Sequence, residues 1–510
     1  MEKGVVSGPR MGYMAFGERC IRWGGPDMEK DIAQLYSVVH EVFGFVRGPG
    51  QNMEISEVER SLLSMLMRVG RQALITYLDE KGSGYQGEEI IDAQGETLPY
   101  VRDRKCVYRS VFGPIEINRA YYQAKGAEGI FPLEGEINLP ARGYSYFLQE
   151  ISSKLAVNGS YEKACEVFSD IFSLDIPIRS LERIVGDTCE DVSGYYEEKP
   201  APELDPDAII TVATVDKKGV VIRKPPSDET DVETGCVDPN KPGKKKMSTE
   251  ICAYTIKRHI RSADDVAGEM VGEKTLPFKP KPQTKLVWGS LSEGPEKTVA
   301  RLAEAVTERL CWASELVCVL DGEKPLWRLV HQYFPMAFFV LDIFHVLEHL
   351  SEAAHCFYKE KSPEAKRFVQ NRLKMLLTGN AGQMIGGLKQ ILTKRSLSNT
   401  QKYTLNKVIG YLERNKHHMR YDVCLERGYP IGSGVIEGAC RNLINDRLEL
   451  TGMRWTVQGA ESVIRLRAVY INKDWKDFWR FRRKSEKDRL YGISSNQEDH
   501  LDDETLLKAA

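Results

Sequence analysis

The sequence predicts an α/β protein whose core alternates apolar strands with helices, preceded by a mainly helical region that contains a β-hairpin. Residues 31–45 and 56–77 repeat apolar side chains every three or four positions, which is typical of amphipathic helices. Beyond residue 207, short β-prone runs alternate with helical patterns, which indicates strands buried on both faces of a sheet. Residues 345–420 are almost wholly helical in pattern. We therefore expect an α/β core accompanied by a helical segment.

The region before the core predicts a hairpin at residues 105–123 around a Gly113-Pro114 turn. Further helices are expected at 144–156, at 161–172 and from about 180 to 195. The last two, joined by a short turn, have the outline of a helix-turn-helix motif, whose second helix would enter a DNA major groove. Packed helical hairpins have the same outline, so DNA recognition and plain packing both stay open.

Composition places the chain among folded globular proteins, with 510 residues of which 42% are hydrophobic and 28% charged. Lys and Arg total 71 against 73 Asp and Glu, so a polyanion partner has to be met by local basic patches. No apolar run reaches the ~20 residues of a membrane span, and the first 25 residues lack the apolar stretch of a signal peptide. We expect a cytoplasmic protein with no membrane partner. Eleven cysteines occur without a C-x-x-C pair, which argues against disulfides and a zinc ribbon.

Acidic residues follow the predicted strands of the core. The run 208–215 ends at Asp216, the run 315–320 at Asp321 and the run 337–341 at Asp342. Because ligands of α/β sheets bind at the carboxyl ends of strands, these aspartates are candidates for one site. Glu437 offers a third acid, in a glycine-rich entry to a helix. Gathered carboxylates repel one another unless cations neutralise them, and all-oxygen ligands favour Mg²⁺ or Mn²⁺. Two such ions, ~3.5 to 4 Å apart, could catalyse displacement at phosphorus.

Basic residues concentrate in the C-terminal part, with thirteen Lys or Arg against seven Asp or Glu from Arg441 to Arg489. For Trp475 and Trp479, four positions apart on a helix, packing is the preferred interpretation. The candidate DNA-binding residues are Arg441, Arg454 and Trp455, together with Lys244, Lys245 and Lys246, which we expect to contact the DNA backbone from a loop.

Several motifs together resemble the DDE transposases of bacterial insertion sequences, closest to the ISKra group, which is related to Mutator-like transposases. The resemblance covers roughly residues 207–479 and rests on VDKKG, VLDGEKPLW, LDIFHVLEHL and the long run that starts GYPIGSGVIEGACR and continues through GMRW to KDW. It implies an RNase H-like catalytic core with an all-helical insertion before the glutamate. It further implies a metal-dependent enzyme that binds the terminal inverted repeats of its element, cleaves DNA strands and transfers them to a target.

The resemblance also implies residue roles. Asp216, Asp321 and Glu437 would be the catalytic triad and hold two Mg²⁺ or Mn²⁺ ions, without zinc. Asp342 and His345 match the pattern of an acid followed three positions later by histidine, and would support the site; Asp342 is also the rival of Asp321 as metal ligand. Bringing two DNA ends together implies a homodimer or higher oligomer. A bacterial, nucleoid-associated location follows from the family.

The expected regions are six: an N-terminal helical region at 1–95, a hairpin and helix-turn-helix-like DNA-binding region at 96–200, the first part of the core at 201–345, a helical insertion at 346–427, the core C-terminal part with the catalytic glutamate at 428–472, and a basic helix with an acidic tail at 473–510.

Two rival functions remain. His345, Glu348 and His349 spell H-x-x-E-H, in which two histidines on one helical face bind zinc and the glutamate acts as base of a metallopeptidase. A catalytically silent DNA-binding derivative of a transposase is the other.

Overall fold

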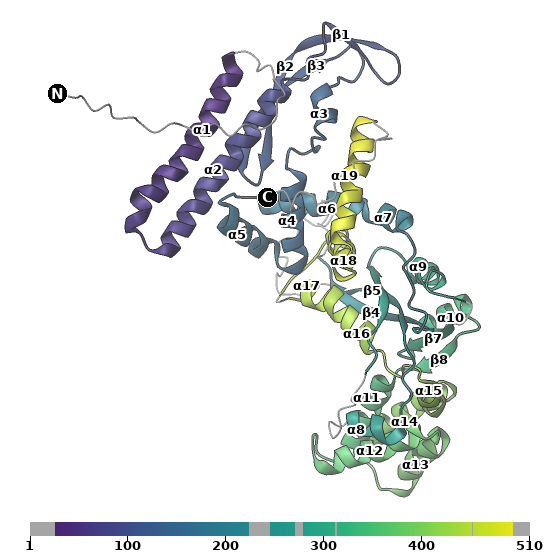
Figure 1. Ribbon diagram of the computed structural model, residues 1–510. Helices are drawn as coiled ribbons and strands as arrows, with labels where there is room; N and C mark the ends of the chain where they lie inside the picture. Colours follow the sequence, from purple (N-terminus) through teal and green to yellow (C-terminus); the bar gives the residue numbers. More distant parts are fainter. Residues whose placement is uncertain (1–25, 224–244, 271–278, 312–313, 451, 493–510) are drawn as a thin grey trace, which may run out of the picture. The chain divides into compact units, whose positions relative to one another are not determined.

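A computed structural model describes residues 26–223, 245–270, 279–311, 314–450 and 452–492 (Figure 1). The described residues form two compact units: those up to residue 148 together with 487–492, and those between 149 and 486. Lys244 lies outside the described residues. None of the helices in the described ranges is long and apolar enough to cross a membrane.

The first unit combines a pair of long helices with a small antiparallel sheet (Figure 1). Its elements are α1 (Pro26–Arg47), η1 (Pro49–Asn52), α2 (Ile55–Lys81), β1 (Glu89–Ile91), β2 (Thr97–Ser110), β3 (Gly113–Tyr122), α3 (Pro132–Glu136) and the start of α4 (Tyr146–Asn158). Leu78 of α2 packs with Ile115 and Ile117 of β3, and with Leu133. The predicted helices and hairpin are confirmed. Gly113, with φ +117°, allows the chain to re-enter the sheet in a conformation that other residues rarely adopt.

A mixed five-stranded sheet in the order β6-β5-β4-β7-β8 forms the centre of the second unit. Its strands are β4 (Ile210–Val221), β5 (Lys245–Ile256), β6 (Gln283–Ser290), β7 (Glu315–Leu320) and β8 (Phe338–Leu341). Strands β4, β5 and β6 pair antiparallel, whereas β7 and β8 run parallel to β4. Most of their apolar side chains are buried, whereas Met247 near the start of β5 is 53% exposed. The predicted α/β core is therefore confirmed.

Strand β4 corrects one prediction. The strand does not end at Asp216 but continues to Val221, because β5 pairs with it as far as Val221↔Lys245. The parallel pairing with β7 stops at Thr214↔Val319, so only this side of β4 ends near Asp216. Lys245 and Lys246, expected in a loop, are the first residues of β5.

Helices accompany the sheet in the second unit. They are α5 (Tyr161–Phe172), α6 (Ile178–Glu190), α7 (Val192–Glu198), α8 (Ala263–Met270), α9 (Pro295–Thr307), α10 (Lys324–Tyr333), α11 (Ile343–His355), α12 (Pro363–Leu377), α13 (Ala381–Lys394), α14 (Asn399–Arg414), η2 (Lys416–His418), α15 (Tyr421–Arg427), α16 (Gly434–Cys440), η3 (Arg441–Asn445, a π-helix), α17 (Asp446–Leu448), α18 (Val457–Ile471) and α19 (Trp475–Tyr491). Trp475 and Trp479 are 6% and 0% exposed, which confirms the predicted packing.

The helix-turn-helix outline is present as α5 and α6. Ser160 caps α5 by accepting a hydrogen bond from the backbone N–H of Lys163, and Ser173 ends the helix in a left-handed conformation. Helix α6 buries Leu181 and Ile184 and packs on α18. One face of α6 therefore belongs to the core, which leaves the opposite, exposed face as the part that could contact a partner.

Candidate active site

Asp216 and Asp321 lie on neighbouring strands at matching positions. The parallel register of β4 and β7 pairs Thr214 with Val319, and two more residues along each chain lead to the two aspartates. Burial raises the pKa of Asp321, and the negative charge of the nearby Asp216 adds to the rise. The structure therefore brings together two of the three acids proposed from the sequence.

The carboxylate of Asp216 is 17% exposed and is held by its own strand. Its Oδ1 accepts a hydrogen bond from the backbone N–H of Lys217 at 2.7 Å. Its Oδ2 lies 3.2 Å from Lys218 Nζ, which is the nearest compensating charge. Cys440 is a buried residue of the neighbouring helix α16 and faces Asp216. Burial raises the pKa of the Cys440 thiol, and the negative charge of Asp216 makes a smaller contribution in the same direction.

Asp321 follows β7 directly and has few partners. Its Oδ1 accepts one hydrogen bond, from the backbone N–H of Glu323 at 3.0 Å. The turn depends on Gly322, whose φ of +91° and close approach to Tyr411 leave no room for a side chain. Tyr411 also donates a hydrogen bond to the backbone carbonyl of Asp321 at 2.7 Å. Burial is the main reason why the pKa of Asp321 is raised, and the charge of Asp216 adds to it. This carboxylate is thus held in place without being neutralised.

Asp342 follows β8 and is fully buried, with both oxygens occupied. Oδ1 accepts from the backbone N–H of Ser433 at 2.9 Å and of Phe344 at 3.2 Å. Oδ2 accepts from the Ser433 hydroxyl at 2.6 Å and contacts His345 Nδ1 at 2.7 Å. Burial opposes ionisation, but these hydrogen bonds outweigh it and hold the pKa of Asp342 below its usual value. The same bond raises the pKa of His345 to about 9. Asp342 therefore caps the N-terminus of α11 and connects this helix to Ser433, the residue before α16.

Glu437 lies on α16, the helix that also carries Cys440. Its side chain is exposed and lines a surface hollow of about 490 Å³ beside α11, together with Glu348, Glu352 and His355. Within the described ranges, no group of three or more His, Cys, Asp and Glu side chains is arranged to hold a metal ion. Glu437 therefore does not meet Asp216 and Asp321 in this arrangement, although its helix packs on β4 and β5.

Glu250 is a further acid that the sequence reasoning missed. It pairs directly with Asp216 across β4 and β5, so the two side chains point to the same face of the sheet. Glu250 is 0% exposed, and no hydrogen bond of good geometry reaches either carboxylate oxygen from the described residues. Burial raises the pKa of Glu250 to about 8, with a contribution from Asp216. The signal in the sequence is a lone acid at the start of the mainly apolar run EICAYTI.

The donor set formed by Asp216 and Asp321 fits a hard divalent cation. Both groups offer carboxylate oxygens, both are partly shielded from water, and Lys218 is the single ammonium group paired with them in the described residues. Mg²⁺ is commonly held by one or two carboxylates with water and substrate phosphate completing its shell. These two residues could hold one ion, and a second would need Glu437 or Glu250.

The DNA-binding candidates of the C-terminal part lie in different environments. Arg441 is exposed, 3.5 Å from Asp446 Oδ1. Arg454 is half-buried next to Trp455, which is only 7% exposed and donates its indole N–H to the carbonyl of Leu448 at 3.1 Å. Trp455 thus packs in the interior, where its ring cannot stack on a base in this arrangement.

The two histidines of the H-x-x-E-H motif lie one turn apart on α11. His345 is bound to Asp342, and His349 Nδ1 lies 3.1 Å from Glu352 Oε2. The ring of His349 also packs on Tyr411, with centroids 4.0 Å apart. Among the described side chains, no third ligand joins them to complete a zinc site.

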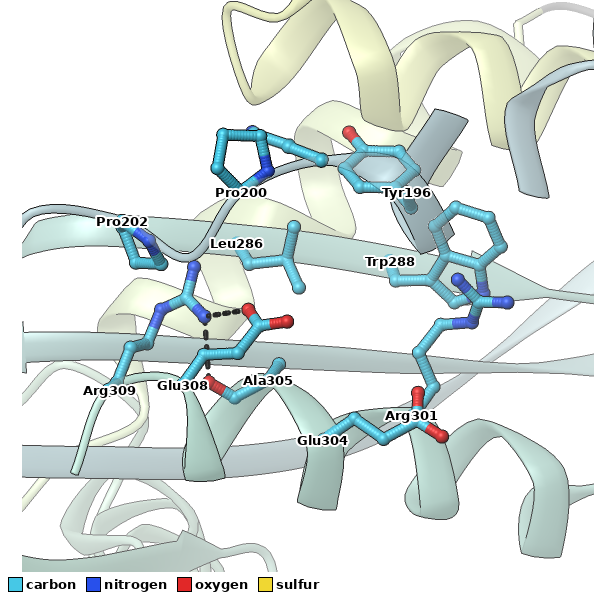
Figure 2. Close-up of a pocket in the computed structure, with 11 residues that line it drawn as sticks. Tyr196, Pro200, Pro202, Leu286, Trp288, Arg301, Glu304, Ala305, Glu308 and Arg309 are labelled. Atoms are coloured by element: carbon cyan, nitrogen blue, oxygen red, sulfur yellow. Dashed lines mark hydrogen bonds and ion pairs between the residues drawn. The ribbon is translucent and has the colours of Figure 1, made fainter. Parts of the chain in front are cut away.

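A separate small pocket lies between α9, β6 and the segment after α7 (Figure 2). It measures about 60 Å³, enough for a few water molecules. Arg301 stacks over Trp288 with its guanidinium carbon 4.2 Å from the ring centroid. Because Trp288 adjoins Gly289, the β6 partner of Glu250, Trp288 points to the opposite face of the sheet. The pocket is therefore not part of the carboxylate site.

Comparison with known proteins gives a partial match. Residues 284–421 match the family model described as Transposase (DDE_Tnp_ISL3). This span contains Asp321, Asp342 and His345, but neither Asp216 nor Glu437. A solved structure, "Drosophila P element transposase strand transfer complex", aligns with 11% identity over 67% of this chain and 84% of that chain, with a TM-score of 0.24. At this score the similarity does not establish a shared fold. No curated protein matches the sequence.

Proposed function

We propose that the chain is a DDE-type transposase of a bacterial insertion sequence, related to the ISKra group and the Mutator-like transposases. It would bind the terminal inverted repeats of its element, cleave DNA in a metal-dependent reaction and transfer the freed strand to target DNA. The observation that carries the proposal is the pairing of Asp216 and Asp321 at matching positions of adjacent parallel strands, with little compensating charge. The match of residues 284–421 to a transposase family supports it.

The mixed sheet of β6, β5, β4, β7 and β8 would be an RNase H-like core, and the helices between α11 and α16 its insertion. In this proposal Asp216 and Asp321 hold Mg²⁺ or Mn²⁺, and Glu437 completes the set when α16 moves or its side chain turns inward. Ions held there would activate a hydroxyl or water and would stabilise the leaving oxygen. Asp342 keeps His345 charged and fixes the start of α11 beside the site. No zinc is required.

The partner would be DNA, both at the element's ends and at the target. Arg441, Arg454, Lys244, Lys245 and Lys246 would contact its backbone, whereas the buried Trp455 would position Arg454. Synapsis of two ends requires a homodimer or a higher oligomer. The proposed location is the bacterial nucleoid.

Cleavage of a duplex that carries the terminal repeats tests the proposal. Asp216→Asn, Asp321→Asn and Glu437→Gln should each lower the metal-dependent cleavage rate at least about a hundredfold, because metal catalysis contributes several kcal/mol. Glu348→Gln is the matched control: this acid lines the same hollow as Glu437 and should leave the rate unchanged. Full activity of the three variants would refute the assignment, and cleavage without divalent metal would refute the mechanism.

A further inference from the structure

A basic hollow of about 420 Å³ opens where the end of β4 meets the chain before α18. Its lining includes Tyr161, Glu182, Arg223, Arg447, Arg454 and Trp455. The segment Gly452–Trp455 is tied to β4 by two backbone hydrogen bonds, from Trp455 N–H to the carbonyl of Val221 at 3.1 Å and from Arg223 N–H to the carbonyl of Trp455 at 2.8 Å. One wall of the hollow therefore has a fixed backbone, because the end of β4 and Trp455 pair as neighbouring extended segments.

Arg447 lies beneath the hollow and carries a buried charge. It is 0% exposed, and its guanidinium lies over the rings of Tyr161 and Trp455, at 5.3 and 4.8 Å from their centroids. Its Nε donates to the carbonyl of Ala156 at 2.8 Å, and its Nη1 reaches only the weak acceptor Sδ of Met453 at 3.3 Å. Its Nη2 has no hydrogen-bond partner in the described part of the chain.

No carboxylate pairs with Arg447 among the described residues. Burial lowers the pKa of Arg447 to about 10, and the nearby charge of Arg467 acts in the same direction. A buried cation without a counter-charge is costly, so the surroundings favour any anion that can reach it.

Two further arginines lie at the rim. Arg223 is exposed, and its Nε donates to the carbonyl of Arg454 at 3.2 Å. The guanidinium of Arg454 makes no ion pair with the described residues. Glu182 is the acid in the lining, so the formal charge of the named side chains is positive by two.

We infer that this hollow binds one phosphate of the DNA backbone, with Arg223 and Arg454 as direct contacts and the buried charge of Arg447 attracting the anion from below. The inference rests on the proposed function, because DNA is the polyanion that a transposase meets. Neither Arg223 nor Arg447 stood out in the sequence, because the hollow forms only when residues 223, 447 and 454 come together.

The position along the DNA can be bounded. Arg223 follows Asp216 by seven residues, and a strand rises about 3.3 Å per residue, so their Cα atoms are at most about 23 Å apart. Base pairs of B-DNA repeat about every 3.4 Å. The side chains at both ends add several ångströms to this distance, so the bound phosphate should lie within about one helical turn, roughly ten base pairs, of the scissile bond.

The salt dependence of DNA binding tests the inference on the full-length protein. Affinity for a 30-base-pair duplex of arbitrary sequence is measured by fluorescence anisotropy over a series of NaCl concentrations. Each neutralised phosphate contributes about 0.9 to the slope of log K against log[NaCl]. The double variant should reduce the slope by about 0.9, and Arg223→Gln and Arg454→Gln should each reduce it by no more than this amount, because both contact one phosphate. Arg301→Gln, which removes an arginine stacked on Trp288, is the matched control and should keep the wild-type slope.

A wild-type slope in the double variant would overturn the inference, and a loss of about 1.8 would mean two separate phosphates and also overturn it. A second measurement alters the DNA: a single neutral methylphosphonate linkage is moved stepwise within about ten base pairs of the cleavage site. At one position it should weaken binding of the wild type but not of the double variant. Absence of such a position would contradict the site. If the wild type cleaves DNA but no variant changes the slope, the phosphate site is rejected and the proposed transposase function stands. If the variants show the expected slopes but the wild type does not cleave, the phosphate site stands and the proposed function is rejected.

Discussion

Two neighbouring strands, β7 and β8, both end in Val-Leu and are followed directly by an aspartate, yet the two aspartates lie in opposite environments. Asp342 is fully buried, accepts hydrogen bonds on both oxygens and has a lowered pKa. Asp321 accepts one backbone hydrogen bond, faces the charge of Asp216 and has a raised pKa. A carboxylate whose oxygens already accept hydrogen bonds from the protein stabilises the fold. A carboxylate with few hydrogen-bond donors or positive charges around it is available to bind a cation. The difference assigns Asp342 to structure and makes Asp321 the stronger metal candidate.

The largest effect should follow from Asp342→Ala. The substitution leaves the backbone N–H groups of Phe344 and Ser433, the Ser433 hydroxyl and His345 without their acceptor, at a buried position. We expect the free energy of unfolding to fall by about 3–5 kcal/mol, as for other broken buried ion pairs. Urea denaturation followed by circular dichroism measures it. A loss below about 1 kcal/mol would remove the structural role assigned to Asp342.

Ser433→Ala should cost less, about 1.5–3 kcal/mol, because it removes one hydrogen bond to a charged acceptor and keeps the backbone bond to Asp342. Ser351→Ala is the matched control, since that hydroxyl only donates to the carbonyl of Leu347 within α11. The same denaturation experiment applies. Equal losses for the two serines would contradict the special role of the Asp342 anchor.

His345→Gln should have a small and pH-dependent effect. The Asp342 carboxylate raises the pKa of His345 to about 9, from an ordinary value near 6.5. The stabilisation by protonated His345 is therefore complete below pH 6.5 and is lost as pH rises through about 9. Since 41% of the His345 side chain is exposed, we expect at most about 1 kcal/mol.

Thermal unfolding between pH 6 and 10 measures this contribution. The wild type should lose stability across the window, and His345→Gln should lose less. His355→Gln, at an exposed position of the same helix, should follow the wild type. A wild-type profile in His345→Gln would show that the pair with Asp342 does not contribute.

The sequence predicted the fold better than the site. The run 315–320 was predicted with the observed bounds of β7, because an apolar strand bounded by Asp-Gly is a local signal. The end of β4 was misplaced, since its last residues depend on pairing with β5, a strand that begins more than twenty residues later. Asp342 stayed a rival of Asp321 as metal ligand in the sequence analysis, because the partner that separates the two, Ser433, lies 91 residues beyond Asp342. Glu250 was missed because its importance comes from register, which places it opposite Asp216.

The smallest change in stability, and the sharpest distinction between the two aspartates, should come from Asp321→Asn. Without metal, removing a carboxylate that faces Asp216 should leave the free energy of unfolding unchanged or raise it by up to about 1 kcal/mol. A ligand that binds only the folded state stabilises it by RT ln(1 + [L]/Kd), so Mg²⁺ should raise the melting temperature of the wild type. Asp321→Asn should lose this increment.

The Asp342→Ala protein, although less stable, should keep the Mg²⁺-dependent rise in melting temperature, because Asp342 has no free lone pair directed to a cation in this arrangement. The same titration with Ca²⁺ separates occupation of the site from catalysis, since binding alone shifts the melting temperature. If Asp342→Ala lost the rise and Asp321→Asn kept it, Asp342 would be the ligand and the contrast between the two Val-Leu-Asp ends would be reversed. In that case, the number of hydrogen bonds that an aspartate accepts after its strand would not distinguish a structural aspartate from a metal-binding one in this sheet.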